Sequence, residues 1–149
     1  MWTTLRRNAP FAAVLALTAF AMPGCDDSVE PEPEPEVETL RLTIGTQTVS
    51  VNIDSGVITG GPVVIQRGNT NLLAVFLRAD GTPDPLVTAT TFRLEVTSSN
   101  NAVLTFTRSG PFTGTLNGLQ AGTATVSFAL FHLEENHNEW ERSVSIQVQ

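Results

Sequence analysis

The stretch Gly122-Thr-Ala-Thr-Val-Ser-Phe-Ala-Leu130 alternates between two kinds of side chain. Every second residue from Ala124 to Leu130 is apolar, whereas the positions before and between them begin Thr, Thr, Ser. Side chains of a β-strand point alternately to the two faces of its sheet. The stretch therefore predicts a strand with one face in a hydrophobic core and the other in solvent.

The same period of two recurs from Thr39 to the C-terminus, and no stretch there has the period of an amphipathic helix. Asn71–Arg78 is apolar on both faces, as expected of a central strand in a two-layer core. Turn residues such as Gly45-Thr46 separate the expected strands. We predict an all-β domain over residues 39–149, folded as a β-sandwich. A brief strand is expected at Val63–Ile65. The other expected strands each place these residues on one face: Leu40, Leu42 and Ile44; Val49, Val51 and Ile53; Phe92, Leu94 and Val96; Ala102, Leu104 and Phe106; Val144, Ile146 and Val148.

Two motifs, Thr97-Ser-Ser-Asn-Asn-Ala-Val103 and Gly118-Leu-Gln-Ala-Gly-Thr-Ala-Thr-Val126, resemble the bacterial immunoglobulin-like domains of invasin- and intimin-type surface proteins. In that family the first motif opens one strand and the second opens the next-to-last strand. The resemblance covers residues 62–149 and implies that the sandwich, for which the pattern predicts about seven to nine antiparallel strands, is immunoglobulin-like. We expect Gly118 and Gly122 to adopt dihedrals closed to other residues, and Leu119 to plug the end of the sandwich.

The N-terminal region has the order of segments found in exported proteins. Arg6 and Arg7 precede an apolar stretch over residues 11–20 that is short for a bilayer span and typical of a signal peptide. Gly24 then precedes Cys25, the chain's single cysteine. This order resembles a bacterial lipoprotein signal, in which the cysteine is lipidated and becomes the mature N-terminus. We predict a signal peptide over residues 1–24, cleavage between Gly24 and Cys25, and lipidation of Cys25, with an uncleaved membrane or buried helix as the alternative.

Residues 25–38 are predicted to form an acidic, proline-rich linker. Seven of the chain's 15 acidic residues lie between Asp26 and Glu38. Such a segment stays extended, and at about 3.1 Å per residue it spans roughly 30–40 Å. Recognition by a partner or binding of cations is the alternative role. Without the leader and the linker, six arginines face eight acids, a net charge of 6 − 8 = −2. Nucleic-acid binding, which needs a cationic surface, is therefore not predicted.

Motifs for catalysis are weak. Asp54-Ser55-Gly56 is similar to the Asp-Ser/Thr-Gly signature of aspartic proteases, but that chemistry needs two such carboxylates and the sequence has one copy. A turn is expected there, and also around Asp80 and Asp84, where a calcium site is the alternative. Neither a Ser-His-Asp order, a phosphate-binding glycine loop nor a cysteine nucleophile is present. We predict no enzymatic activity and no cofactor.

The segment His132-Leu-Glu-Glu-Asn-His-Asn-Glu139 gathers both histidines of the chain and three carboxylates. Its histidines are five residues apart, not the four of helical His-Glu-x-x-His zinc sites. A long polar hairpin loop is expected, and a divalent-metal site is the alternative. Trp140 is expected to pack at the edge of the sandwich, with an exposed contact for a partner as the alternative. The candidate metal ligands are His132, Glu134, Glu135 and His137.

Taken together, these features predict a lipid-anchored, extracytoplasmic module of the cell envelope, in either the inner or the outer membrane. Its expected role is adhesion to a protein or polysaccharide, or structural display. A periplasmic lipoprotein that binds a divalent metal through residues 132–139 is the second hypothesis. Neither hypothesis sets an oligomeric state.

Overall fold

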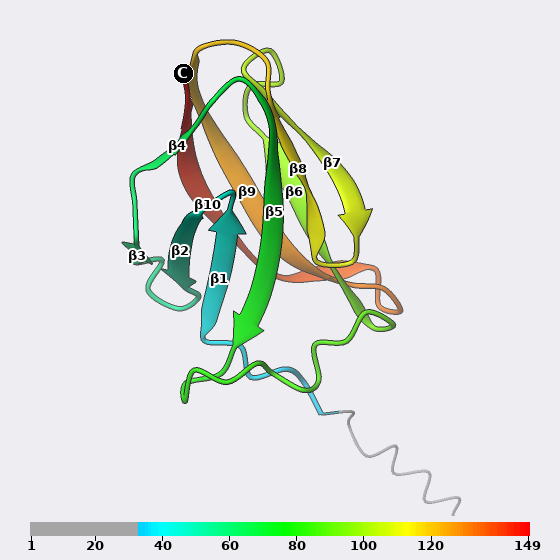
Figure 1. Cartoon of the computed structure of the whole chain (residues 1–149). Helices are drawn as coiled ribbons and strands as arrows, with labels where there is room; N and C mark the ends of the chain where they lie inside the picture. Colours follow the sequence, from blue (N-terminus) through cyan, green and yellow to red (C-terminus); the bar gives the residue numbers. More distant parts are fainter. Residues whose placement is uncertain (1–32) are drawn as a thin grey trace, which may run out of the picture. The chain divides into compact units, whose positions relative to one another are not determined.

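The computed structural model describes residues 33–149, so the predicted signal peptide, Cys25 and the first part of the linker lie outside the described residues. This part of the chain forms ten strands in two sheets (Figure 1). Within residues 33–149, no helix is long and apolar enough to cross a membrane. The strands are β1 (Thr39–Ile44), β2 (Gln47–Asn52), β3 (Ile58–Thr59), β4 (Val63–Ile65), β5 (Gly68–Leu77), β6 (Phe92–Ser98), β7 (Leu104–Gly110), β8 (Thr113–Gly118), β9 (Gly122–His132) and β10 (His137–Val148).

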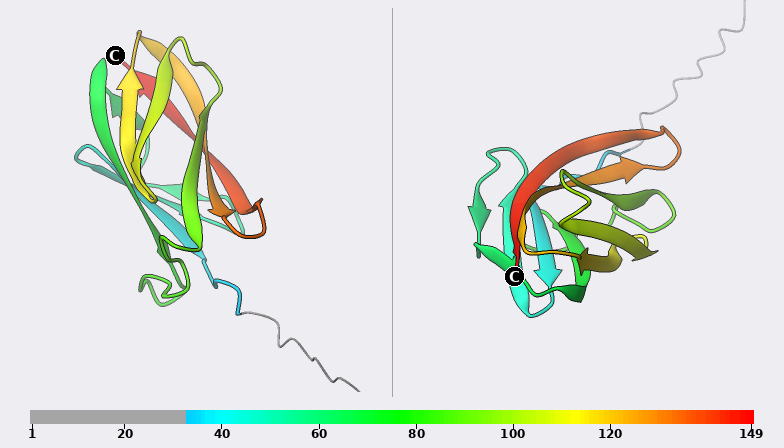
Figure 2. Two further views of the ribbon diagram at one scale, coloured as in Figure 1. Left: turned by 90° about the vertical axis from the view of Figure 1, so that its right-hand side faces the viewer. Right: turned by 90° about the horizontal axis from the view of Figure 1, so that it is seen from above.

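The two sheets pack face to face, which confirms the predicted β-sandwich (Figure 2). The larger sheet has the order β3-β2-β1-β5-β8-β7, and the smaller has the order β4-β10-β9-β6. Two details differ from the prediction. Ten strands form rather than seven to nine, because β3, of two residues, and β8 add to the eight strands expected. In addition β4 runs parallel to β10, with Val63 opposite Ile146 and Ile65 opposite Val148.

The strand order is that of a constant-type immunoglobulin sandwich. In that fold, strands A, B, E and D form one sheet, and C, F and G form the other. Here β1-β5-β8-β7 reproduces the first set and β6-β9-β10 the second. The remaining strands extend this arrangement: β2 and β3 add to the first sheet beyond β1, and β4 adds to the second beyond β10.

The stretch from Ala124 to Leu130 lies at the centre of the smaller sheet, where β9 pairs with both β10 and β6. Ala124, Val126, Phe128 and Leu130 are all buried, as the period of two predicts. Phe128 is among the largest fully buried side chains, alongside leucines of β1, β6 and β8 from both sheets. Burial of each such side chain contributes about 1.5–3 kcal/mol, so this face supplies much of the driving force for folding.

The outer face of β5 is less buried than expected for a strand that is apolar on both faces. Leu72, Ala74 and Phe76 point into the core, whereas Leu73 on the opposite face is 44% exposed. The larger sheet therefore has one face packed on the core and one facing solvent, as is common for antiparallel sheets.

The end of the sandwich near Leu119 corrects two predictions. Leu119 does not plug the core, because its side chain is 52% exposed. Val103 is buried there instead, and its carbonyl accepts a hydrogen bond from the Leu119 N–H at 2.8 Å. Ala102, predicted on a strand, lies in the preceding turn. Gly122 does have a positive φ of 153°, but Gly118 does not: a Cβ on Gly118 would lie 2.8 Å from the Gln66 carbonyl oxygen, so close packing requires this glycine.

Candidate functional site

The hairpin between β9 and β10 carries both histidines. β9 ends at His132 and β10 begins at His137, and the two residues face each other in the strand register. Only residues 133–136 lie between the strands, so the predicted long loop is in fact short. Asn136 closes it in a left-handed conformation with φ of 56°, and its N–H donates to the His132 carbonyl at 3.0 Å. Asparagine tolerates this conformation better than most residues do.

Four side chains of this hairpin form a closed set of contacts, here called the His–Glu ring: His132, Glu135, His137 and Glu139. Nδ1 of His132 lies 3.2 Å from Oε1 of Glu139 and 3.5 Å from Oε2 of Glu135. His137 completes the ring, with Nδ1 3.4 Å from Oε2 of Glu135 and Nε2 3.4 Å from Oε1 of Glu139. The hairpin thus gathers two imidazoles and two carboxylates.

The ring differs from the predicted ligand set by one residue. Glu134 is exposed and makes none of the ring contacts, whereas Glu139 belongs to the ring although it was not among the predicted ligands. The sequence contains a signal that favours Glu139 as a member of the ring. His137 and Glu139 are two residues apart on one strand, so their side chains share a face of the sheet.

His132 is the least exposed member of the ring, with 12% of its side chain exposed. Its imidazole packs on Phe92, with the ring centroids 4.7 Å apart and the ring planes at 31°. Both of its ring nitrogens are buried and have no hydrogen-bond partner among the described residues. Buried polar atoms without a partner are rare in native proteins, and in many cases they mark the place where an ion or a water binds.

Trp140 follows the ring on β10 and packs against the core, as expected. Its indole lies 5.5 Å from the Phe76 ring, and Phe76 in turn contacts Phe112 at 5.3 Å. Trp140 is only partly buried as a residue, but its indole Nε1 is buried and makes no hydrogen bond within residues 33–149. A partner contact through Trp140 therefore stays a prediction.

A second polar cluster at the same end of the sandwich surrounds Asp84, and we call it the Asp84 latch. Asp84 is 4% exposed. Its Oδ2 accepts a hydrogen bond from the Glu36 N–H at 2.7 Å, and its Oδ1 accepts one from the Leu86 N–H at 2.9 Å. Arg78 Nε lies 3.5 Å from Oδ2. The latch therefore fastens the end of the acidic segment to the turn after β5.

The last residues of the acidic segment join the sandwich in other ways as well. The Glu38 N–H donates to the Leu77 carbonyl at 2.9 Å, and the Glu38 carbonyl accepts from the Ile53 N–H at 2.7 Å. Val37 packs against the hydrophobic core. Hydrogen bonds of this segment to the sandwich thus begin, among the described residues, at Glu36, three residues before the start of β1.

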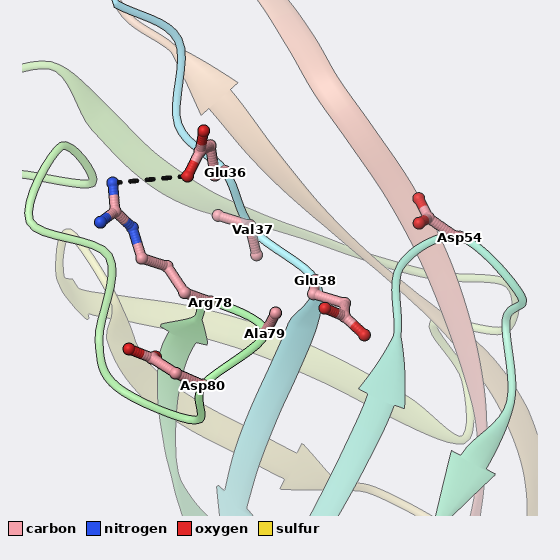
Figure 3. Close-up of a pocket in the computed structure, with 7 residues that line it drawn as sticks. All are labelled: Glu36, Val37, Glu38, Asp54, Arg78, Ala79 and Asp80. Atoms are coloured by element: carbon pink, nitrogen blue, oxygen red, sulfur yellow. Dashed lines mark ion pairs between the residues drawn. The ribbon is translucent and has the colours of Figure 1, made fainter.

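Asp80 and Asp84 form a turn, and they do not converge on a common point. The exposed Asp80 accepts hydrogen bonds from the side chain and the backbone N–H of Thr82, and these lower its pKa. Asp84 points instead into the latch. Asp80 and Arg78 line an open cleft of about 460 Å³ together with Glu36, Val37, Glu38, Asp54 and Ala79 (Figure 3). In this cleft Arg78 pairs with Glu36 at 3.8 Å, while Asp54 lies apart from them on the far side of Glu38.

Asp54-Ser55-Gly56 forms the predicted turn after β2. The backbone N–H and the hydroxyl of Ser55 both donate to the Asn52 side-chain oxygen, at 2.8 and 2.7 Å. Gly56 has a positive φ of 70°, which glycine adopts at no steric cost. Turn geometry therefore accounts for the likeness of this motif to the aspartic-protease signature.

Comparisons with known proteins do not add a functional assignment. No protein-family model matches the chain, and no curated protein matches it. Among solved structures, the chain is similar to one described as the ZirS C-terminal Domain, with 12% sequence identity and a TM-score of 0.37. That alignment covers 97% of this chain and 87% of the other. Similarity at this level carries no argument about function.

Proposed function

We propose that this protein is a lipid-anchored module of the bacterial cell envelope, exposed outside the cytoplasm, which binds a macromolecular partner through an open sheet edge. The observation that supports binding is the unpaired edge of β7. An open strand edge presents a row of backbone N–H and C=O groups that another extended segment can pair with. A protein is therefore favoured over a polysaccharide as the partner, and binding is favoured over turnover.

Three of the four sheet edges are partly capped or very short. The Gln47 side chain hydrogen-bonds both the N–H and the carbonyl of Val64, which caps the edge of β4. On β6 the Leu94 N–H donates to the Pro111 carbonyl at 2.7 Å, and the Leu94 carbonyl accepts from Arg108 at 2.9 Å. At the third edge, β3 has only two residues.

The fourth edge, that of β7, has seven residues and pairs only with β8 among the described strands. In Figure 1 this strand runs along the margin of the larger sheet, with no neighbour on its outer side. Native edges are usually protected by lysine, proline, β-bulges or inward-pointing charge, and β7 has one bulge, between Arg108 and Gly110 at its C-terminal end. The only charged residue of β7, Arg108, is held by Leu94 and by Glu95, and its two threonines, of which Thr107 is exposed, are neutral.

The anchoring part of the proposal rests on Cys25 and on the way the chain enters the sandwich. The latch holds Glu36 at one end of the domain, whereas the C-terminus lies at the opposite end, where the Arg67 N–H donates to the Gln149 carbonyl (Figure 1). An N-terminal anchor would therefore hold the domain by a single end. One acyl chain binds membranes only marginally, but the several chains implied by the lipoprotein resemblance make attachment lasting.

The anchor is tested by fractionating cells that produce the Cys25→Ser variant. We expect the wild-type chain in the membrane fraction and the variant in the soluble extracytoplasmic fraction. Retention of the variant in the membrane fraction contradicts lipid anchoring through Cys25.

The edge is tested by site-specific photocrosslinking in the native envelope. A crosslinker at Thr107 on β7 should give a discrete protein adduct, and Thr105→Lys in the same chain should abolish it because an edge lysine opposes strand addition. A crosslinker at Thr48, an exposed position on the internal strand β2, serves as the matched control. Equal adducts at Thr48 and Thr107, or none at Thr107, contradict binding at the β7 edge.

A further inference from the structure

We propose that His132, Glu135 and Glu139 bind one divalent transition-metal ion, for which Zn²⁺ is the best match, and that His137 positions the two carboxylates. This site is independent of the β7 edge, because the ring lies on the other sheet.

The spacing of the donor atoms is the first argument. Zn²⁺ is held by nitrogen and oxygen ligands at about 2.0–2.2 Å, so neighbouring ligand atoms in a tetrahedral site lie roughly 3.4 Å apart. Nδ1 of His132 lies 3.2 Å from Glu139 and 3.5 Å from Glu135. One donor atom from each of the three residues lies within 4.8 Å of the other two. Only a small approach of the two carboxylates, of which Glu135 is 61% exposed, completes the site.

The second argument is that the contacts within the ring do not satisfy His132. Neither nitrogen of its imidazole makes a hydrogen bond within residues 33–149, although two carboxylates are close by. Burying such atoms without partners is unfavourable, and a metal bond to Nδ1 removes that cost for one of them. The stacking on Phe92 fixes the orientation of the His132 imidazole and therefore the direction of its Nδ1 lone pair.

Charge supplies the third argument. Glu135 and Glu139 bring two negative charges together, and among the described residues their only ionic partners are the two histidines. The nearby Arg93 and Arg142 are engaged elsewhere, by Glu95 and by backbone carbonyls including that of Ile53. A divalent cation neutralises the pair of carboxylates, which no arginine within residues 33–149 does.

The donor set also selects the class of ion. One imidazole nitrogen and two carboxylate oxygens suit Zn²⁺ and its first-row neighbours. Calcium takes six to eight oxygen ligands, and the ring offers a nitrogen at its most buried position. We therefore expect the site to discriminate against calcium.

His137 touches both carboxylates but through different nitrogens, Nδ1 toward Glu135 and Nε2 toward Glu139. One imidazole cannot direct both nitrogens at one ion. His137 therefore contacts the two glutamates without binding the ion itself, as residues that orient metal ligands do. Its loss should weaken binding without abolishing it.

Isothermal titration of the full chain, carrying Cys25→Ser to remove the only thiol and stripped of metal by a chelator, tests the site. We expect one Zn²⁺ per chain with a dissociation constant of about 10 µM or tighter, and Ca²⁺ binding at least about 100-fold weaker. Glu139→Gln should weaken Zn²⁺ binding by more than the roughly 10–100-fold expected for His137→Gln. Glu134→Gln, which changes a neighbouring exposed carboxylate, should leave the Zn²⁺ affinity essentially unchanged.

A two-dimensional NMR titration provides a second readout that does not depend on a His132 variant being folded. Zn²⁺ should shift the His132 imidazole signals of the chain at a ratio of one ion per chain. Zn²⁺ binding no tighter than about 1 mM, a Glu134→Gln loss equal to that of Glu139→Gln, or unchanged His132 signals would each overturn the site. A complete loss in His137→Gln overturns its positioning role.

Discussion

The Asp84 latch and the His–Glu ring are two ionisable clusters at the same end of one sandwich, and they differ in how well the polar atoms of their most buried side chain, Asp84 or His132, are satisfied. Arg78 Nε, 3.5 Å from Asp84, itself makes no hydrogen bond within residues 33–149. Phe76 connects them, since its carbonyl accepts the Asp84 N–H and its ring packs on Trp140, next to Glu139. Each carboxylate oxygen of Asp84 accepts a backbone N–H at 2.7 or 2.9 Å. The buried nitrogens of His132 have no such partner within residues 33–149.

This difference separates a structural role from a binding role. A buried carboxylate that receives several donors is costly to remove, because its partners lose their acceptor. A buried imidazole that receives none contributes little to folding through its polar atoms, and those atoms are free to meet a ligand. The latch should therefore be sensitive to mutation, and the ring tolerant, when folding is measured without metal.

The largest effect is expected for Asp84→Ala. The change removes the acceptor of the Glu36 and Leu86 N–H groups and one partner of Arg78, so the free energy of unfolding should fall by about 2–4 kcal/mol. Urea unfolding in the Cys25→Ser background measures it. The control is Asp80→Ala in the same turn, which should leave stability nearly unchanged because Asp80 is exposed. Equal losses in the two variants would show that the latch is not structural.

A smaller effect, of the opposite sign, is expected for His132→Phe in the presence of a chelator. Phenylalanine keeps the stacking on Phe92 and removes two unsatisfied nitrogens, so stability should stay within about 1 kcal/mol of the wild type or rise. Thermal unfolding with and without Zn²⁺ checks this prediction. Zn²⁺ should stabilise the wild type and should not stabilise the variant. A loss above about 2 kcal/mol without metal would mean that His132 is itself structural.

The fold could be predicted from the sequence because its main signal is local. The alternation from Ala124 to Leu130 fixes which side chains face the core, whatever strands lie beside it. The parallel pairing of β4 with β10 joins segments that are far apart in the chain and leaves no mark on either strand. The burial of Val103 rather than Leu119 at the sandwich end also depends on tertiary packing, because both residues lie between strands, where no period orders the side chains.

In the two polar clusters, too, the sequence predicts the local features, and tertiary contacts determine the others. Asp80 and Asp84 share one turn motif, and local chemistry favours a turn at both. Asp84 turns inward because it meets the N–H of Glu36, 48 residues earlier in the chain. In the ring, the place of Glu139 follows from its two-residue spacing to His137. The choice of Glu135 over Glu134 follows from the four-residue loop closed by Asn136, which the expectation of a long loop did not include.

The smallest effect concerns Asp80, the exposed counterpart of Asp84 in the same turn. The Thr82 hydroxyl and then the Thr82 N–H donate to Asp80 and lower its pKa below its ordinary value. A carboxyl whose pKa is lower in the folded state stabilises the fold at pH values above its unfolded pKa, and this contribution is lost as the pH falls through the folded pKa. Thr82→Val should therefore raise the Asp80 pKa toward that ordinary value and remove part of the acid dependence of stability below about pH 4.

Carboxyl NMR titration measures the shift in the Asp80 pKa, and Thr82→Ser, which keeps the hydroxyl, should preserve the low value. Both variants keep the backbone N–H of residue 82, so the comparison isolates the hydroxyl hydrogen bond, which is the larger of the two causes. An unchanged Asp80 pKa in Thr82→Val would mean that the side-chain hydrogen bond does not hold this turn in solution, and would leave Asp84 as the one carboxylate that orders it.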